Sequence, residues 1–211
     1  MMTDSAYNPL SKRNLGDSVA KAAIQGPVHP LPPKKFAGAG IYLIYYFGSF
    51  PAYKEIATHN LGSDPNFPIY VGKAVPKGAR KGGFGLDEDP GFVLHGRLTE
   101  HASSINQAEN LSIDDFSCRY LVVDDIWIPL AESLLIERYQ PIWNKQIDGF
   151  GNHDPGAGRR KQRKSPWDAL HPGRPWANLL DPPSSRPDEV SERAELFLGK
   201  VVRSWRDERK K

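Results

Sequence analysis

Three polar side chains in the middle of the chain occupy positions where they could carry chemistry. Arg97 and His101 lie at i and i+4, so a helix over 92–108 would place them on one face. Glu132 falls on the apolar face of a second predicted helix, over 129–140, where an unpaired carboxylate is costly. Such a carboxylate needs a partner, which is either a metal ion or a buried hydrogen bond or salt bridge. Both interpretations of Glu132 stay open, and the Arg97–His101 pair taken alone favours a solvent-facing surface.

Two tyrosines precede these residues on predicted strands. Tyr42 closes a Gly-Ile-Tyr tripeptide in a strand over 40–47, and Tyr70 begins Tyr-Val-Gly in a strand over 68–74. Side chains alternate between faces along a strand, so Tyr42 points away from Tyr45, which we expect in the core. Tyrosine is common in strands, and ordinary packing explains either tripeptide when it is taken alone.

The strands and helices predicted to position these residues indicate an α+β fold. The predicted strands cover 40–47, 68–74 and 116–124, and the predicted helices cover 16–25, 92–108, 129–140 and 187–206. We expect a small mixed or antiparallel three-stranded sheet flanked by helices, with long loop insertions and terminal extensions. Nineteen glycines and nineteen prolines favour such irregular connections. The apolar stripe of the last helix predicts packing against the core, with a dimer contact as the alternative.

Composition divides the chain into three segments. An N-terminal arm covers 1–36, a core with insertions covers 37–148, and a basic extension rich in glycine and proline, ending in a helix, covers 149–211. A chain of 211 residues can hold all three in one compact domain.

Several classes of protein are excluded by composition. Hydrophobic residues make up 39% and charged residues 25%, as in soluble globular proteins, and no apolar run reaches the ~20 residues of a membrane span. The single cysteine, Cys118, rules out a disulfide within the chain and a zinc site made of cysteines, and its predicted strand favours a core thiol. The N-terminal segment lacks the apolar region of a secretory signal. We therefore expect a cytoplasmic protein.

In their order along the chain, these pieces resemble the GIY-YIG nuclease superfamily. The order is a Gly-Ile-Tyr strand, a Tyr-Val-Gly strand, a helix with Arg97 and His101, a strand, a helix with Glu132, and then Asn144. The resemblance covers about 40–145 as the catalytic core, and the tail resembles the extension of the type II restriction endonucleases of that superfamily. Valine replaces isoleucine in the second tripeptide, and a long insertion separates two strands that many members join by a hairpin. Restriction-enzyme members resemble this chain in carrying insertions there.

The resemblance implies metal-dependent hydrolysis of phosphodiester bonds. Glu132 would bind one divalent metal ion per active site, with Mg²⁺ as the expected ion and Mn²⁺ able to substitute. Tyr42 would act as general base or orient the attacking water, and nearby cations would favour its phenolate. His101 and Lys73 are the alternative handlers of the proton, and Lys73 could instead reach a phosphate.

Three further roles follow from the same resemblance. Tyr70 would hydrogen-bond the phosphate or the water. Arg97 would donate two parallel hydrogen bonds to phosphate oxygens, which suits its planar guanidinium. Asn144 would orient a phosphate or Glu132, although on its own it also fits a residue that ends a helix.

Two basic segments are candidates for binding double-stranded DNA, because phosphate neutralisation supplies much of the affinity for a duplex. The first contains Lys77, Arg80 and Lys81, and the second contains Arg159, Arg160, Lys161, Arg163 and Lys164. Each segment taken alone is equally consistent with a solvated basic loop. No membrane partner is expected.

The combined pattern predicts a type II restriction endonuclease of the bacterial cytoplasm that cuts a specific, palindromic site. One chain holds one catalytic set, so cleavage of both strands predicts a homodimer on DNA. A homing or repair nuclease is the alternative within the superfamily. A homing nuclease would usually add a separate DNA-binding tail, and a repair nuclease would usually have further domains or be a much smaller single module. A non-catalytic DNA-binding protein of the same fold, and an unrelated α/β binding protein, are the alternatives outside nuclease chemistry.

Overall fold

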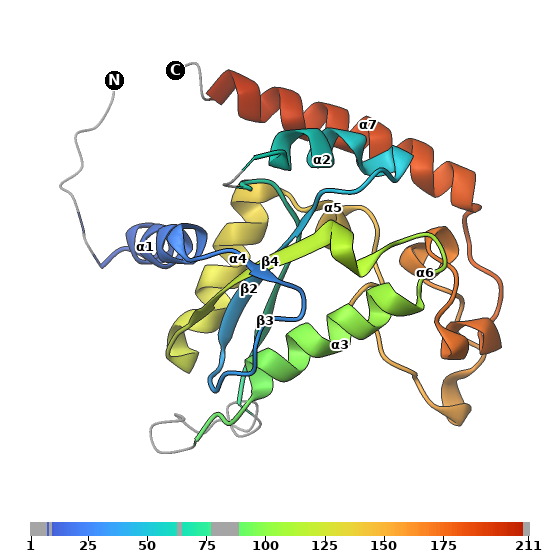
Figure 1. Cartoon of the computed structure of the whole chain (residues 1–211), viewed down its shortest axis with the longest axis horizontal. Coiled ribbons are helices and arrows are strands. Elements are labelled where there is room, and N and C mark those ends of the chain that lie inside the picture. The colour runs from blue at the N-terminus through green and yellow to red at the C-terminus, as the bar shows by residue number, and fades with distance from the viewer. Residues whose placement is uncertain (1–7, 9, 63–64, 77–88, 209–211) are drawn as a thin grey trace.

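An antiparallel sheet forms the centre of the molecule (Figure 1). The computed structural model describes residues 8, 10–62, 65–76 and 89–208, without the side chains of residues 206–208. Within these residues the sheet has four strands in the order β1-β4-β2-β3, and all neighbours are antiparallel. The strands are β1 (His29–Pro30), β2 (Gly40–Tyr46), β3 (Pro68–Ala74) and β4 (Phe116–Val122). The strand β3 therefore forms one edge of the sheet.

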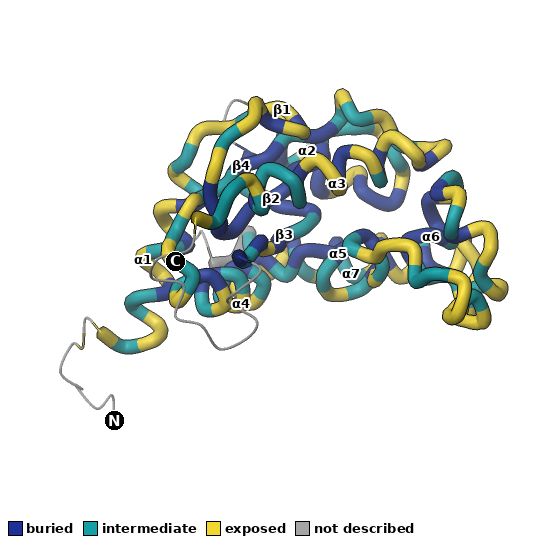
Figure 2. Tube along the Cα trace, turned by 90° about the horizontal axis from the view of Figure 1, so that it is seen from below, coloured by how far each residue is buried: buried dark blue, intermediate teal, exposed yellow. Residues whose placement is uncertain are grey.

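Helices cover both faces of this sheet. They are α1 (Lys12–Gln25), α2 (Lys54–Asn60), α3 (Val93–Gln107), α4 (Ile128–Tyr139), α5 (Ile142–Lys145), α6 (Pro166–Leu170) and α7 (Pro187–Glu208). Figure 2 shows the sheet between α3 on one side and α1 with α4 on the other. The first helix starts at Lys12, earlier than the predicted 16, because the Ser11 hydroxyl caps it by accepting a hydrogen bond from the Asn14 amide at 3.2 Å.

Alternation along β2 builds two separate cores. Tyr42, Ile44 and Tyr46 belong to the cluster on the α3 side. Leu43 and Tyr45 belong to the cluster that α1 and α4 cover. The predicted faces of this strand are thus confirmed, and every residue of β2 is buried.

The prediction of three strands was wrong by one, because β1 lies in the N-terminal arm, where no strand was expected. His29 pairs with Cys118 and Pro30 with Ser117 at the end of the sheet opposite β3. Proline is tolerated on an edge strand, where its missing N–H breaks no ladder. Cys118 is buried, as expected for a core thiol, and burial raises its pKa to about 12.

The C-terminal extension packs into the same core as the catalytic segment. Phe150, Trp167 and Leu170 share one buried cluster with Tyr42. The helix α7 lies beside α2 (Figure 1) and buries an apolar stripe against its own chain. The buried residues of that stripe are Val190, Ala194, Leu198 and Val202. Packing against the core is therefore confirmed for this helix, and the stripe is not free to form a dimer contact.

Candidate active site

The side chain of Tyr42 on β2 lies over Gly72 of the neighbouring edge strand, β3. It lies opposite Gly72 in the antiparallel pairing of β2 with β3. A Cβ atom on Gly72 would lie 2.3 Å from the Tyr42 hydroxyl oxygen, a distance at which something must move. The glycine of the Tyr-Val-Gly tripeptide therefore leaves the space in which the phenol lies.

The hydroxyl of Tyr42 meets His101 of α3. Its oxygen is 2.6 Å from Nε2 of His101, and each residue is 1% exposed. Burial raises the pKa of Tyr42 well above its ordinary value, the neighbouring Tyr70 raises it further, and Arg97 lowers it by less. Burial, with Arg97 next in weight, holds the pKa of His101 well below its ordinary value. The protein's own groups thus favour a neutral phenol beside a neutral imidazole, and not the phenolate that a nearby cation would favour.

Both terminal nitrogens of the Arg97 guanidinium make hydrogen bonds within the protein. Nη1 donates to the Glu100 carboxylate at 2.8 Å and lies 2.6 Å from Nε2 of His153, and Nη2 donates to the Gly151 carbonyl at 2.9 Å. Because a guanidinium only donates, Nε2 of His153 is the acceptor in this contact. Burial raises the pKa of Tyr70, and the nearby Arg97 lowers it by less. A Cβ atom on Gly151 would lie 3.0 Å from Nη2 of Arg97 and 3.2 Å from the Tyr70 hydroxyl, so the arginine lies near this hydroxyl, and its side chain is only 22% exposed.

Glu132 of α4 approaches β3 from the other face of the sheet. Its carboxylate is 2.6 Å from the ammonium of Lys73, and the two side chains are 18% and 38% exposed. The structure thus pairs Glu132 with a cation at the sheet edge, which is the salt-bridge interpretation of this residue.

The same arrangement fits a hydrated divalent cation. Glu132 offers a carboxylate oxygen with partial access to solvent, which suits Mg²⁺, an ion that keeps several waters and needs few protein carboxylates. In the described part of the chain, no group of three or more His, Cys, Asp or Glu side chains is placed to hold a metal ion. Water and phosphate oxygens would therefore have to complete the coordination.

Asn144, of α5, is docked on the backbone of the edge strand. Its side-chain oxygen accepts from the Val71 amide at 2.8 Å, and its side-chain nitrogen donates to the Val71 carbonyl at 2.8 Å. Both ends of the amide are used, so Asn144 ties α5 to the strand between Tyr70 and Gly72. It is thus placed to orient these neighbours through the backbone.

Three residues of the extension also line the site, and sequence analysis missed them. The ring of Phe150 stacks on His101 with centroids 4.4 Å apart and planes 15° apart. Gly151 and His153 supply two of the three acceptors for Arg97 described above. This segment has no periodic pattern of apolar residues that would predict a helix or a strand. The local sequence feature that could have drawn attention to it is an aromatic residue between two glycines, Gly149 and Gly151.

One comparison with known proteins decides the family. A family model described as the Eco29kI GIY-YIG domain matches residues 34–198, well over half of the chain. The chain belongs to the Eco29kI GIY-YIG family. This is a restriction endonuclease family, and membership indicates a nuclease that acts on the phosphodiester bonds of DNA. No curated protein matches the chain.

The Eco29kI-type match extends well beyond Asn144. It includes the Phe150–His153 segment and reaches Leu198 in α7, so the family's domain contains most of the extension. The resemblance to GIY-YIG nucleases of the restriction type is thereby confirmed.

Of the two predicted DNA-binding segments of this GIY-YIG protein, the structure describes the second. Lys77, Arg80 and Lys81 lie outside the described residues. In the second segment, the Arg163 guanidinium donates to the Ser184 hydroxyl at 3.1 Å and the Lys164 ammonium donates to the side-chain oxygen of Asn178 at 3.0 Å. The side chains of Arg159 and Lys161 are exposed, and Arg160 is half-buried. None of the described helices is both long and apolar enough to cross a membrane.

Proposed function

We propose that this protein is a type II restriction endonuclease that hydrolyses both strands of a specific, palindromic DNA site in a metal-dependent reaction. One observation carries the proposal. A buried Tyr42–His101 hydrogen bond and the Lys73–Glu132 pair meet at one edge strand, with Arg97 next to the tyrosines. A proton acceptor, a phosphate-binding cation and a metal-binding carboxylate are the groups that phosphodiester hydrolysis requires.

The proton of the attacking water would move through the Tyr42–His101 pair. His101 is neutral at physiological pH because burial lowers its pKa, so it has a free nitrogen lone pair for the Tyr42 hydroxyl. As the water oxygen bonds to phosphorus, the Tyr42 oxygen accepts the proton of the water while the Tyr42 proton passes to His101. Neither residue carries a net negative charge during this transfer, which suits a site where burial disfavours the phenolate.

Arg97 and Lys73 would hold the phosphate. A phosphate oxygen would take over donors of Arg97 that now serve His153 and Glu100, because a guanidinium pairs with two phosphate oxygens at once. Lys73 would turn from Glu132 to the substrate. A divalent ion at Glu132, when bound, would polarise the phosphate and compensate charge on the leaving 3′ oxygen. The P–O3′ bond then breaks, the leaving 3′ oxygen takes a proton from solvent water, and the products carry a 5′-phosphate and a 3′-hydroxyl.

Two copies of the chain would act on one site. Each chain holds one such set of residues, and a palindrome presents two equivalent scissile phosphates, which a twofold dimer matches. The basic side chains of the second segment, Arg159 among them, would contact the duplex backbone.

Incubation with a phage DNA of known sequence tests the proposal. We expect a discrete set of fragments in Mg²⁺, none in EDTA, and fragment ends that share one short palindrome. Mn²⁺ should restore cleavage after chelation. A smear of products would instead indicate a nonspecific nuclease, single-strand nicks would exclude a dimer acting on both strands, and intact DNA with a mobility shift would indicate a binding protein.

A further inference from the structure

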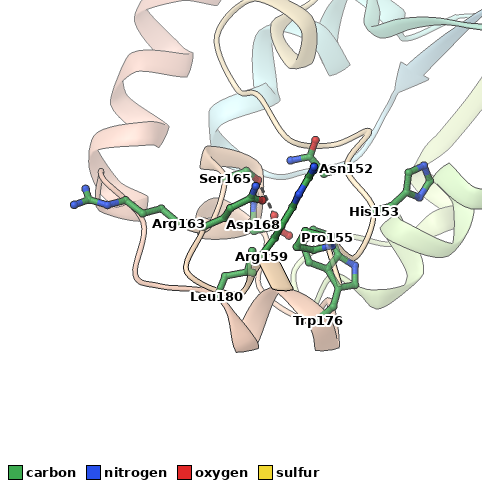
Figure 3. A pocket seen from close by; sticks show the side chains of 10 residues that line it. Asn152, His153, Pro155, Arg159, Arg163, Ser165, Asp168, Trp176 and Leu180 are labelled. Carbon is green, nitrogen blue, oxygen red and sulfur yellow. Dashed lines mark hydrogen bonds between the residues drawn. The ribbon is translucent and has the colours of Figure 1, made fainter. Parts of the chain in front are cut away.

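A cavity of about 230 Å³ lies in the extension, beside the candidate active site. Figure 3 shows the polar side chains around it, which come from the segment after Phe150, from the basic loop and from the turn before residue 181. The lining residues used below are Asn152, His153, Arg159, Trp176 and Asp168. Of all the residues that line it, Arg159 and Arg163 were the candidates for binding DNA.

His153 joins this cavity to the active site. It lines the cavity, and its Nε2 is 2.6 Å from Nη1 of Arg97. If Arg97 holds one phosphate of a DNA strand, the neighbouring nucleotide of that strand can therefore reach the mouth of the cavity.

The charge that the cavity offers is positive. Its buried carboxylate, Asp168, is matched by Arg174, with Nε and Oδ1 2.7 Å apart and both side chains 1% exposed. Within the described part of the chain, the Arg159 guanidinium makes no hydrogen bond or ion pair with another side chain. In Figure 3 Arg159 extends toward Asn152, whereas the guanidinium of Arg163 points outward.

An indole forms an apolar wall. Trp176 is half-buried, and the guanidinium carbon of Arg174 lies 4.7 Å from its ring centroid, which fixes the ring in place. The cavity is smaller than the roughly 300–1,000 Å³ pockets that enclose whole drug-sized ligands. It thus fits one unit of a polymer and not an enclosed free ligand.

We propose that this cavity is a second phosphate subsite, which binds the sugar-phosphate unit next to the scissile phosphate on the cleaved strand. Arg159 pairs with the phosphate oxygens, Asn152 donates to them, and Trp176 packs against the deoxyribose. The subsite reads no base, because phosphate and sugar contacts fix register and carry no direct sequence information. The inference rests on the proposed function and assigns to the extension a direct part in placing the strand.

Neutral phosphate analogues test this subsite in a binding experiment. Duplexes carrying the cleavage site receive one methylphosphonate at a time around the cut position, and their binding is measured in Ca²⁺, without cleavage. In the wild type, we expect one linkage adjacent to the scissile phosphate at which neutralisation weakens binding about tenfold. In Arg159→Ala the same methylphosphonate should weaken binding no further. In Arg159→Lys it should again weaken binding, by less than in the wild type.

Two matched variants separate the subsite from general charge. Arg193→Ala removes the same charge from an exposed position on α7, and it should keep the salt dependence of wild-type binding. Arg159→Ala should instead reduce the slope of log K against log salt by about 0.9, the amount of one phosphate contact. In Arg163→Ala, a methylphosphonate at the linkage next to the scissile phosphate should still weaken binding, whereas in Arg159→Ala it should not.

Failure of the subsite differs from failure of the proposed function. If the wild type cuts DNA but Arg159→Ala stays as sensitive as the wild type at every linkage, the subsite is wrong and the nuclease assignment stands. If the wild type cuts no DNA under any metal, the proposed function fails first.

Discussion

Tyr42 and His101 share a hydrogen bond of 2.6 Å in a place where both side chains are almost fully buried. The bond links a strand residue and a helix residue that are 59 positions apart in the chain. Burial raises the pKa of the phenol and lowers that of the imidazole, so burial disfavours a charge on either partner. In the proposed transfer the Tyr42 oxygen gains a proton from the water as it gives its own to His101, so no phenolate has to form in this buried place.

Tyr42→Phe should abolish most cleavage and leave the fold intact. The variant removes the hydroxyl that contacts His101 but keeps the ring, so we expect kcat to fall about 10²- to 10⁴-fold, the usual range for loss of a general acid–base group. Single-turnover cleavage and circular dichroism would measure the two effects. Tyr45→Phe is the matched control, because it makes the same change on the opposite face of β2. Equal rates for Tyr42→Phe and the wild type would make Tyr42 ordinary strand packing.

Glu132→Gln should separate cleavage from binding. The amide keeps the shape of the side chain but loses the charge that would hold a divalent ion, so we expect cleavage to fall about a thousandfold or more. Binding to a duplex with the site should change little, because phosphate contacts supply most of the affinity. Gel-shift and cleavage assays in parallel would measure both.

The control for that prediction is Glu137→Gln, at an exposed position of the same helix. It should cut at the wild-type rate. Cleavage by Glu132→Gln at the rate of this control would leave Glu132 as a structural partner of Lys73 and would refute the metal assignment.

Gly151→Ala should slow catalysis although it only adds a methyl group. The new Cβ would lie 3.0 Å from Nη2 of Arg97 and 3.2 Å from the Tyr70 hydroxyl, so the arginine must shift by a few tenths of an ångström. We expect kcat to fall about tenfold or more with a smaller change in KM, since small misplacements of a positioned group are costly. Gly158→Ala, which meets nothing within 4 Å, should be indistinguishable from the wild type. Equal kcat in both variants would show that the extension does not position Arg97.

Local patterns were enough to predict most of the fold and to place Tyr42, Arg97 and His101 on their elements. Strand alternation around Tyr42 and the i, i+4 spacing of Arg97 and His101 are properties of short windows, and the structure keeps both. The roles of these residues stay predictions. The docking of Asn144 on Val71 and the contact of Gly151 with Arg97 join segments 73 and 54 residues apart, and no periodicity encodes such contacts. The strand β1 escaped prediction because proline argues against a strand except at an edge, and edge position is itself a tertiary property.

A second buried histidine makes stability depend on pH. His171 is fully buried, its Nε2 is 2.6 Å from the Tyr53 hydroxyl, and its Nδ1 is 2.9 Å from the side-chain oxygen of Asn110. Burial lowers its pKa to about 3, whereas the unfolded chain would protonate it near the ordinary value of ~6.5. Below about pH 6.5 the unfolded state therefore binds a proton that the folded state does not, and the free energy of unfolding falls as the pH drops toward 3.

Urea unfolding at pH 7 and pH 5 measures this effect. The protonation of His171 in the unfolded chain should cost the wild type about 2 kcal/mol between these pH values, by the linkage between pKa and stability. His171→Gln cannot take up that proton and should be less stable than the wild type at pH 7, because it loses a fitted buried ring. Its further loss of stability on going to pH 5 should be about 2 kcal/mol smaller, and the contribution of His101, present in both proteins, cancels in the comparison. Parallel pH dependences for the two proteins would mean that folding does not lower the pKa of His171.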